Sequence, residues 1–169
     1  FWRGESYYRM GEYEKAISDY RTYLNNTRQR NTDMYALAHY NLGYSYFKLK
    51  DYDTALNRFR QYVDMESNQQ AASLADAYNR IGDCLYQNRQ FASAEENYSY
   101  AAQLLPAAGD YSIYQKGFLL GLQKDYNGKI QAMDRLIREY PESQYVDDAL
   151  FEKGRSFVLL EYYSSASQA

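Results

Sequence analysis

The sequence contains very few of the residues that build disulfides, metal sites and sharp bends. Its 169 residues include one cysteine, Cys84, one histidine, His39, and two prolines. A lone cysteine cannot form an intrachain disulfide, and with a lone histidine it cannot supply the ligands of a typical zinc site. The prolines, Pro106 and Pro141, each follow a long stretch with helical periodicity. Disulfide scaffolds and cysteine-rich metal domains are therefore excluded, and long helices are favoured.

Long apolar runs and an excess of one charge are also missing. Asp and Glu number 22 against 19 Lys and Arg, which gives a net charge of −3 without any basic cluster. We therefore expect no nucleic-acid partner. No apolar run approaches the roughly 18 residues that a membrane-spanning helix needs, so we expect no direct membrane insertion by this segment.

Tyrosine, in contrast, is abundant. The chain has 22 tyrosines against 7 phenylalanines and 1 tryptophan. A tyrosine ring can pack while its hydroxyl stays hydrated. Such a side chain suits thin helical layers, in which few positions are fully buried.

A helical pattern repeats along the chain. Apolar residues recur at spacings typical of amphipathic helices, and short breaks at residues 10–12, 49–51, 88–90 and 124–125 separate antiparallel neighbours. Five glycines in similar contexts set the register: Gly4, Gly43, Gly82, Gly117 and Gly154. Nine residues after each glycine stands an aromatic residue: Tyr13, Tyr52, Phe91, Tyr126 and Tyr163.

Two further positions keep their distance from these glycines. Twelve residues on, four repeats have alanine and one has lysine: Ala16, Ala55, Ala94, Ala166 and Lys129. Sixteen residues on, where the sequence reaches that far, stand Tyr20, Phe59, Tyr98 and Met133. We interpret the glycine and alanine as small residues at helix crossings, and the aromatic residue as lying near the turn. The large residue at the sixteenth place is expected to fill the layer between hairpins.

These residues resemble the tetratricopeptide repeat. The matching residues are Leu42, Gly43, Tyr46, Ala55 and Phe59 in one repeat, and Ile81, Gly82, Leu85, Ala94, Tyr98 and Pro106 in the next. The resemblance implies an all-α fold, a right-handed α-α superhelix of antiparallel helix hairpins, in a single array. The expected repeats span residues 1–30 (partial), 34–66, 72–106, 110–141 and 144–169 (partial), as a fragment of a longer protein. In the fourth repeat, Lys116 and Lys129 predict looser packing, with lysine stems reaching outward to solvent.

A narrower resemblance lies near the end of the sequence. The segment Tyr140-Pro141-Glu142-Ser143-Gln144-Tyr145, followed by Ala149 and Gly154, is similar to tetratricopeptide repeats of bacterial cell-envelope proteins. It implies a periplasmic or outer-membrane-associated location. Within it, Ser143 is expected to cap the following helix.

No residue pattern predicts catalysis or cofactor binding. His39 and Cys84 fall at positions that suit packing, and no basic neighbour of Cys84 indicates an activated thiolate. Asn127-Gly128-Lys129 lacks the upstream glycine and following Ser or Thr of a phosphate loop. The acidic pairs Glu95-Glu96 and Asp147-Asp148 fit solvated helix faces. We expect no catalytic residue, no cofactor and no metal, and hence no enzyme.

The resemblance implies a groove lined by the first helix of each hairpin. The residues placed there by register are Tyr40, Asn41, Tyr44, Phe47, Asp76, Asn79, Arg80, Asp83, Tyr111, Tyr114 and Phe118. Some relatives clamp a C-terminal carboxylate with basic and amide side chains on these helices. At the matching places only Asn41 and Arg80 fit, and Glu5 and Asp76 would repel a carboxylate, so that ligand class is not expected.

Two hypotheses for function follow. The first is a scaffold that binds a peptide segment or partner helix of another protein in the groove, with aromatic side chains as anchors. The alternative is a structural module that self-associates into a homo-oligomer through its end hairpins. A third, weaker alternative is a non-catalytic part of a larger enzyme or regulator.

Overall fold

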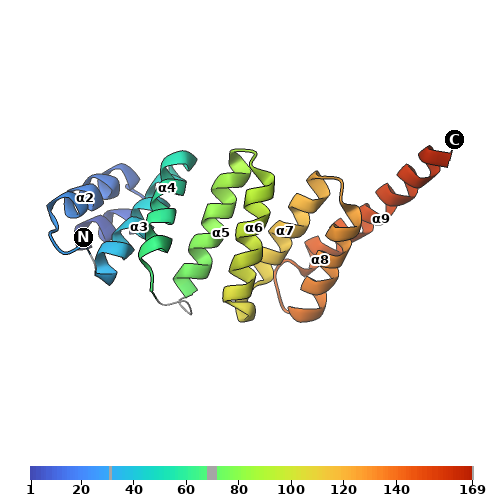
Figure 1. The fold of residues 1–169 in the computed structure, drawn as a ribbon. Coiled ribbons are helices and arrows are strands. Elements are labelled where there is room, and N and C mark those ends of the chain that lie inside the picture. Colours follow the sequence, from blue (N-terminus) through green and yellow to red (C-terminus); the bar gives the residue numbers. More distant parts are fainter. Residues whose placement is uncertain (31, 68–71, 169) are drawn as a thin grey trace. The chain divides into compact units, whose positions relative to one another are not determined.

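A computed structural model describes residues 1–30, 32–67 and 72–168, with side chains up to residue 161. Within these ranges it contains nine α-helices, one short 3-10 helix and no strand (Figure 1). The α-helices are α1 (Trp2–Arg9), α2 (Tyr13–Asn26), α3 (Asp33–Lys48), α4 (Tyr52–Met65), α5 (Ala72–Gln87), α6 (Phe91–Leu104), α7 (Asp110–Leu122), α8 (Tyr126–Glu139) and α9 (Val146–Gln168). The 3-10 helix spans Pro106–Ala108. None of the described helices is long and apolar enough to cross a membrane.

The helices form two compact units that meet within α6. The first unit comprises residues 1–97, in which α1 packs on α2, α2 on α3, α3 on α4 and α4 on α5. The second comprises residues 98–169, in which α7 packs on α8 and α8 on α9. Amphipathic helices joined by short turns bury their apolar stripes against their neighbours, which explains this sequential packing.

Each of four hairpins turns in the same way. The residue seven places after the repeat glycine adopts a left-handed backbone conformation, with φ between 59° and 78°: Gly11, Lys50, Arg89 and Lys124. The next residue donates its N–H to a carbonyl near the end of the first helix, as Asp51 does to Tyr46 at 3.0 Å. This is a Schellman-type helix end. Asp51 and Asp125 then cap the second helix by accepting bonds from the backbone N–H groups of Thr54 and Gly128.

The repeat glycines make room for the residue sixteen places later. A Cβ atom on Gly43 would lie 2.9 Å from the ring of Phe59, and one on Gly4 would lie 3.1 Å from Tyr20. The same relation joins Gly117 to Met133. The prediction of small residues at the crossings is therefore confirmed for the glycines of these three hairpins. The large residue packs on the glycine of its own hairpin, in addition to its expected place in the layer between hairpins.

Aromatic pairs lie across three of the turns. The ring centroids of Tyr8 and Tyr13 are 5.6 Å apart, those of Phe47 and Tyr52 are 5.5 Å apart, and Tyr86 and Phe91 are similarly placed at 5.8 Å. The later member of each pair is the aromatic residue nine places after the glycine, so the prediction that it lies near the turn is confirmed for these hairpins.

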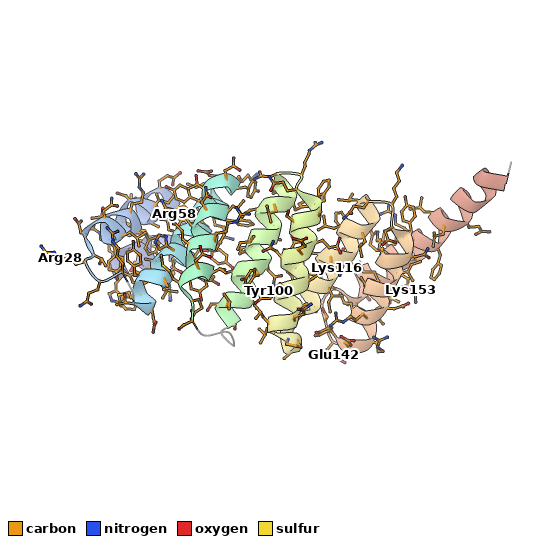
Figure 2. All side chains as sticks on the ribbon, in the orientation of Figure 1. Arg28, Arg58, Tyr100, Lys116, Glu142 and Lys153 are labelled. Atoms are coloured by element: carbon orange, nitrogen blue, oxygen red, sulfur yellow. The ribbon has the colours of Figure 1, made fainter. Side chains whose placement is uncertain are left out.

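The side chain of Lys129 does not lie where the sequence predicted it. It does not reach outward but is buried, with an exposed fraction of 7%, and its ammonium pairs with Glu152 of α9. Gly121 stands where the other hairpins have an aromatic ring, and a Cβ there would lie 2.7 Å from Cδ of Lys129. The lysine stem fills the space that this missing ring leaves. Lys116, labelled in Figure 2, has intermediate exposure.

The fifth repeat departs from the expected hairpin. Its register places a turn before Tyr163, but α9 continues unbroken from Val146 to Gln168. Before α9, Ser143 accepts a bond from the backbone N–H of Tyr145 at 3.2 Å. Because α9 begins at Val146, this bond closes a turn ahead of the helix and is not the expected helix cap.

Candidate binding face

Hydrogen bonds between side chains connect the first helices of three hairpins in the first unit. Tyr40 on α3 donates from its hydroxyl to the Asp76 carboxylate on α5 at 2.7 Å, and the Tyr44 hydroxyl donates to the same oxygen. On the other side of α3, the Asn41 amide donates to Glu5 on α1 at 3.1 Å. Because each bond joins residues about one repeat apart, the side chains form a row across α1, α3 and α5.

We call this row the first-helix face and define it by its members. They are Glu5, Tyr8, Tyr40, Asn41, Tyr44, Phe47, Asp76 and Arg80, all of which lie in the first unit. None of these side chains is fully buried. A surface of partly exposed rings, amides and charges held by cross-repeat bonds is pre-organised for contact with another molecule.

Glu5 holds the α1 side of the first-helix face. Its carboxylate accepts bonds from Asn41, from the Tyr20 hydroxyl at 3.1 Å and from the Arg9 guanidinium at 2.9 Å. Both oxygens are therefore used. The negative charge is compensated by one exposed arginine, so the carboxylate is a structural anchor for the neighbouring donors.

Arg80 holds the α5 side. Its guanidinium bonds to Asp83 at 2.6 Å, and its Nε lies 3.7 Å from an oxygen of Asp76. The same group lies 5.8 Å from the ring centroid of Phe47, within the range of a cation–π contact. With two carboxylates beside it, this arginine has little net charge to offer an incoming carboxylate. The predicted absence of a basic carboxylate clamp agrees with this arrangement.

The rings of Tyr40 and Tyr44 have a packing role as well. Tyr44 lies 5.2 Å from the centroid of Phe59, and Tyr40 lies 4.9 Å from that of Tyr62. Burial, followed by the charge of Asp76, raises the pKa of both tyrosine hydroxyls, so they remain protonated donors at neutral pH. What these residues present to solvent is the exposed part of each ring.

Two residues expected on this surface lie beneath it. Asn79 and Asp83 have exposed fractions of only 8% and 9%. Asp83 is engaged by Arg80. Because these two side chains of α5 are buried in the packed layer, they support the first-helix face without adding accessible area to it. Sequence register alone does not separate such neighbours, since both fall on the same side of the helix.

Tyr111, Tyr114 and Phe118 lie in the second unit, on α7. Tyr114 stacks on Tyr145 with ring centroids 5.1 Å apart and planes inclined by 19°. Tyr111 lies 5.9 Å from Tyr145, so three rings form a cluster between α7 and the segment before α9. Phe118 lies 6.0 Å from the Lys129 ammonium. The rings of Tyr111, Tyr114 and Phe118 are half-buried.

The two residues whose side chains could take part in a reaction, His39 and Cys84, are buried. Burial, and then the charge of Arg58, lower the pKa of His39 to about 4. Burial raises the pKa of the Cys84 thiol to about 12, so no reactive thiolate forms near neutral pH. Among the described residues, no group of three or more His, Cys, Asp or Glu side chains is placed to hold a metal ion.

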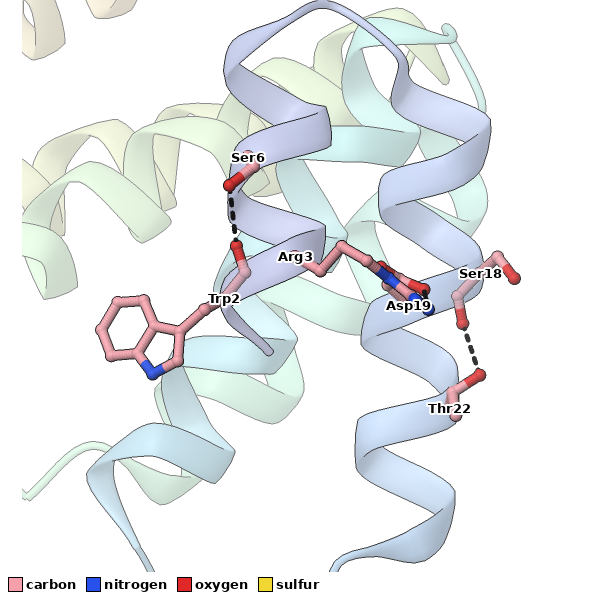
Figure 3. Close-up of polar contacts among 6 residues, drawn as sticks. All are labelled: Trp2, Arg3, Ser6, Ser18, Asp19 and Thr22. Carbon is pink, nitrogen blue, oxygen red and sulfur yellow. Dashed lines mark hydrogen bonds and ion pairs between the residues drawn. The ribbon is translucent and has the colours of Figure 1, made fainter.

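A hollow of about 420 Å³ lies between α1 and α2, but its charges are already paired. Arg3 and Asp19 form a two-point ion pair across it, with both N–O distances at 2.6 Å (Figure 3). The Thr22 hydroxyl, also on its wall, donates to the carbonyl of Ser18 in its own helix. The two charged side chains that line this hollow therefore bind each other.

Comparison with known proteins identifies the repeat. Three family models, each described as tetratricopeptide repeat, match residues 1–66, 40–110 and 111–143. Together they cover residues 1–143, which contain four of the five glycines that set the register. No curated protein matches the chain.

Several solved structures share the fold. BtubC from P. vanneervenii is 16% identical with a TM-score of 0.78, and the alignment covers 98% of this chain and 73% of BtubC. The apo form of RapI is 16% identical with a TM-score of 0.80 over 98% of this chain and 64% of RapI. MamA is 16% identical with a TM-score of 0.71 over 96% of both chains. The predicted all-α helical-repeat superhelix class is thereby confirmed.

Proposed function

The chain belongs to the tetratricopeptide repeat family, and from that premise we propose that it is a non-catalytic module that binds a segment of another protein. Repeats of this kind expose long surfaces built from successive helices, and such surfaces suit extended or helical protein segments. No residue pattern in the sequence points to catalysis. His39 and Cys84, whose side chains could in principle take part in a reaction, are buried packing residues.

The first-helix face carries this proposal. Its tyrosines, Phe47 and Arg80 belong to the residue types that dominate binding energies at protein interfaces. Hydrogen bonds to Glu5 and Asp76 fix the side chains before any partner arrives. Less conformational entropy is then lost on binding, which favours affinity. The partner we propose is a peptide segment or helix without a dominant C-terminal carboxylate.

A selected peptide provides the test. A displayed library of random peptides is screened against the chain, and the affinity of the best binder is measured for the wild type and for Asn41→Ala and Arg80→Ala. We expect each change to weaken binding by about tenfold or more, as for truncation at an interface hot spot. Arg60→Ala, an exposed position on α4, is the matched control and should leave the affinity within about twofold. If all three variants bind like the wild type, the partner does not use the first-helix face.

We also propose that the parent protein works in a bacterial cell envelope. The support is the likeness of residues 140–145, with Ala149 and Gly154, to envelope members of the family. Fractionation of the source cells with an antibody against this chain should recover it with periplasmic or outer-membrane proteins. Recovery with cytosolic proteins would contradict this location.

A further inference from the structure

The Asp76 carboxylate is a partly exposed acceptor on the first-helix face. It lies on α5, with described helices before and after it along the chain, and its side chain has an exposed fraction of 35%. The hydroxyls of Tyr40 and Tyr44 both donate to one oxygen, Oδ2. The other oxygen, Oδ1, lies 3.7 Å from the Nε of Arg80, which is longer than a hydrogen bond. Oδ1 can therefore accept a hydrogen bond from another molecule.

The arginines of this surface are bound to other carboxylates. The Arg80 guanidinium forms its short bond with Asp83, at 2.6 Å. Arg9 pairs with Glu5 at 2.9 Å. Three carboxylates therefore stand against two guanidinium groups, and Asp76 is the one whose charge is least neutralised. These five side chains carry an excess of negative charge, and the excess is located at Asp76.

Tyrosine rings lie beside this charge. The centroids of Tyr40 and Tyr44, both bonded to Asp76, are 5.0 Å apart, and Tyr8 on α1 lies 6.4 Å from Tyr44. Burial is the main cause of the raised pKa of Tyr8, and the charges of Glu5 and Asp76 add to it, so the negative potential extends from α5 to α1. The face of an aromatic ring attracts cations as well. Carboxylate and rings thus favour the same kind of ligand group.

We propose, on the premise that the first-helix face binds a protein segment, that this segment is basic. A lysine or arginine side chain of the partner donates a hydrogen bond to Oδ1 of Asp76, and its methylene stem lies on the exposed part of the Tyr44 ring. A charge-assisted bond of this kind is about twice as strong as a bond between neutral groups. Opposite charge also speeds the encounter and rejects acidic segments. The partner is therefore a peptide segment or helix with at least one lysine or arginine.

Other ligands fit this arrangement less well. An acidic segment would be repelled by Asp76. A purely apolar segment would cover the carboxylate and leave its charge without water or a partner, which carries a large desolvation cost. A metal ion would need more ligands, and among the described residues no group of three or more His, Cys, Asp or Glu is placed to hold one. A basic segment is the occupant that satisfies Asp76 directly.

The charge preference of selected peptides gives the first test. A displayed library of random peptides is screened against the full chain, and the binders that Asn41→Ala weakens are sequenced. We expect lysine and arginine to be enriched by about twofold or more over the unselected library, and Asp and Glu to be depleted. Raising the NaCl concentration from about 50 mM to about 500 mM should weaken the best binder severalfold, because salt screens charge pairs at a partly exposed site.

A double-mutant cycle locates the contact. In the best binder each lysine or arginine is replaced in turn by norleucine, which keeps an aliphatic stem and removes the charge. In the chain, Asp76→Asn keeps an acceptor for the tyrosine hydroxyls and removes the negative charge. One peptide replacement should weaken binding to the wild type about tenfold and binding to Asp76→Asn less than about twofold. Arg80→Ala cannot serve here, because it also removes the contact with Phe47 and the bond to Asp83.

Asp64→Asn is the matched control for the loss of charge. It removes the same charge from an exposed position on α4, outside the first-helix face, and should change the affinity less than about twofold. Circular dichroism verifies that each variant is folded. If Asp76→Asn is not folded, the charge preference and the salt dependence of the wild type still decide.

Two results would overturn the preference for a basic segment alone. The first is a set of binders that Asn41→Ala weakens but that contain no excess of lysine and arginine. The second is a cycle in which the norleucine replacements weaken binding to the wild type and to Asp76→Asn equally. Binders that no variant of the first-helix face weakens would instead contradict binding at this surface, and the basic partner with it.

Discussion

Single buried polar side chains decide several properties of this protein. His39, Lys129 and Glu152 are all buried, and the cost of their burial is lowered in two different ways. Burial and Arg58 keep His39 neutral, whereas Lys129 and Glu152 neutralise each other. Neutralising or pairing a buried group is the way proteins avoid a large desolvation penalty.

His39 predicts a loss of stability in mild acid. Its pKa of about 4 in the folded chain lies below its ordinary value of 6.5, so between these values the unfolded state binds a proton that the folded state does not. Stability is complete above pH 6.5 and falls as the pH is lowered towards 4. Between pH 7.5 and pH 5 the loss should be on the order of 2 kcal/mol. Denaturant unfolding of the wild type and of His39→Phe at both pH values checks this, and an equal pH dependence in the variant would contradict it.

The ion pair of Lys129 and Glu152 predicts a strong asymmetry between variants. Although burial opposes ionisation, Lys129 and then Arg155 hold the pKa of the Glu152 carboxyl below its usual value. Glu152→Ala leaves the lysine charge buried without its partner and should cost about 3 kcal/mol. Lys129→Met combined with Glu152→Gln should restore most of that stability, because no buried charge remains. Thermal and denaturant unfolding compare the variants; a double variant no more stable than Glu152→Ala would refute the buried-charge argument.

At the scale of elements, the hairpin is the unit that the sequence predicts best. Gly4, Gly43 and Gly117 lie against the large residue sixteen places later, and the aromatic residues lie near the turns of three hairpins, as predicted. The repeat register did not predict the packing of the fourth hairpin. There Gly121 replaces a large aromatic residue and Lys129 replaces a small alanine, so the positions of the small and large side chains are exchanged. The register also failed at α9, which continues past the expected turn to Gln168. Both failures depend on local contacts that a single register does not contain.

The first-helix face was predicted only in part, because periodicity does not show which side chains are buried. Periodicity placed Tyr40, Asn41, Tyr44 and Arg80 on one side of their helices, and the structure shows them partly exposed there. Periodicity did not distinguish Asn79, which is buried one position away. The anchoring roles of Glu5 and Asp76 were also missed, although their spacing from Asn41 and Tyr40, 36 residues in each pair, was a usable signal.

Two glycines of equal register should respond to the same substitution with opposite signs. Gly43→Ala places a Cβ 2.9 Å from the Phe59 ring, and the repacking should cost about 1–2 kcal/mol even after the gain in helix propensity. Gly154→Ala meets no neighbour and should stabilise α9 by up to about 1 kcal/mol. Chemical unfolding of the two variants beside the wild type is sufficient. Equal effects would show that the pairing of glycine with the residue sixteen places later is not what shapes the hairpin.

At the scale of the whole molecule, the first-helix face lies within one compact unit, residues 1–97. Variants of exposed residues in the other unit, residues 98–169, therefore serve as controls for it. In a family whose members share a fold without sharing partners, such surface-specific tests are the route from fold to function.

Hydroxyl-radical footprinting with a selected peptide binder tests the central claim most directly. Mass spectrometry would measure oxidation of aromatic side chains with and without the binder. We expect protection of Tyr8, Tyr44 and Phe47, with unchanged oxidation of Tyr100, an exposed ring on α6. Unchanged oxidation of the first three, together with protection elsewhere, would contradict binding at the first-helix face.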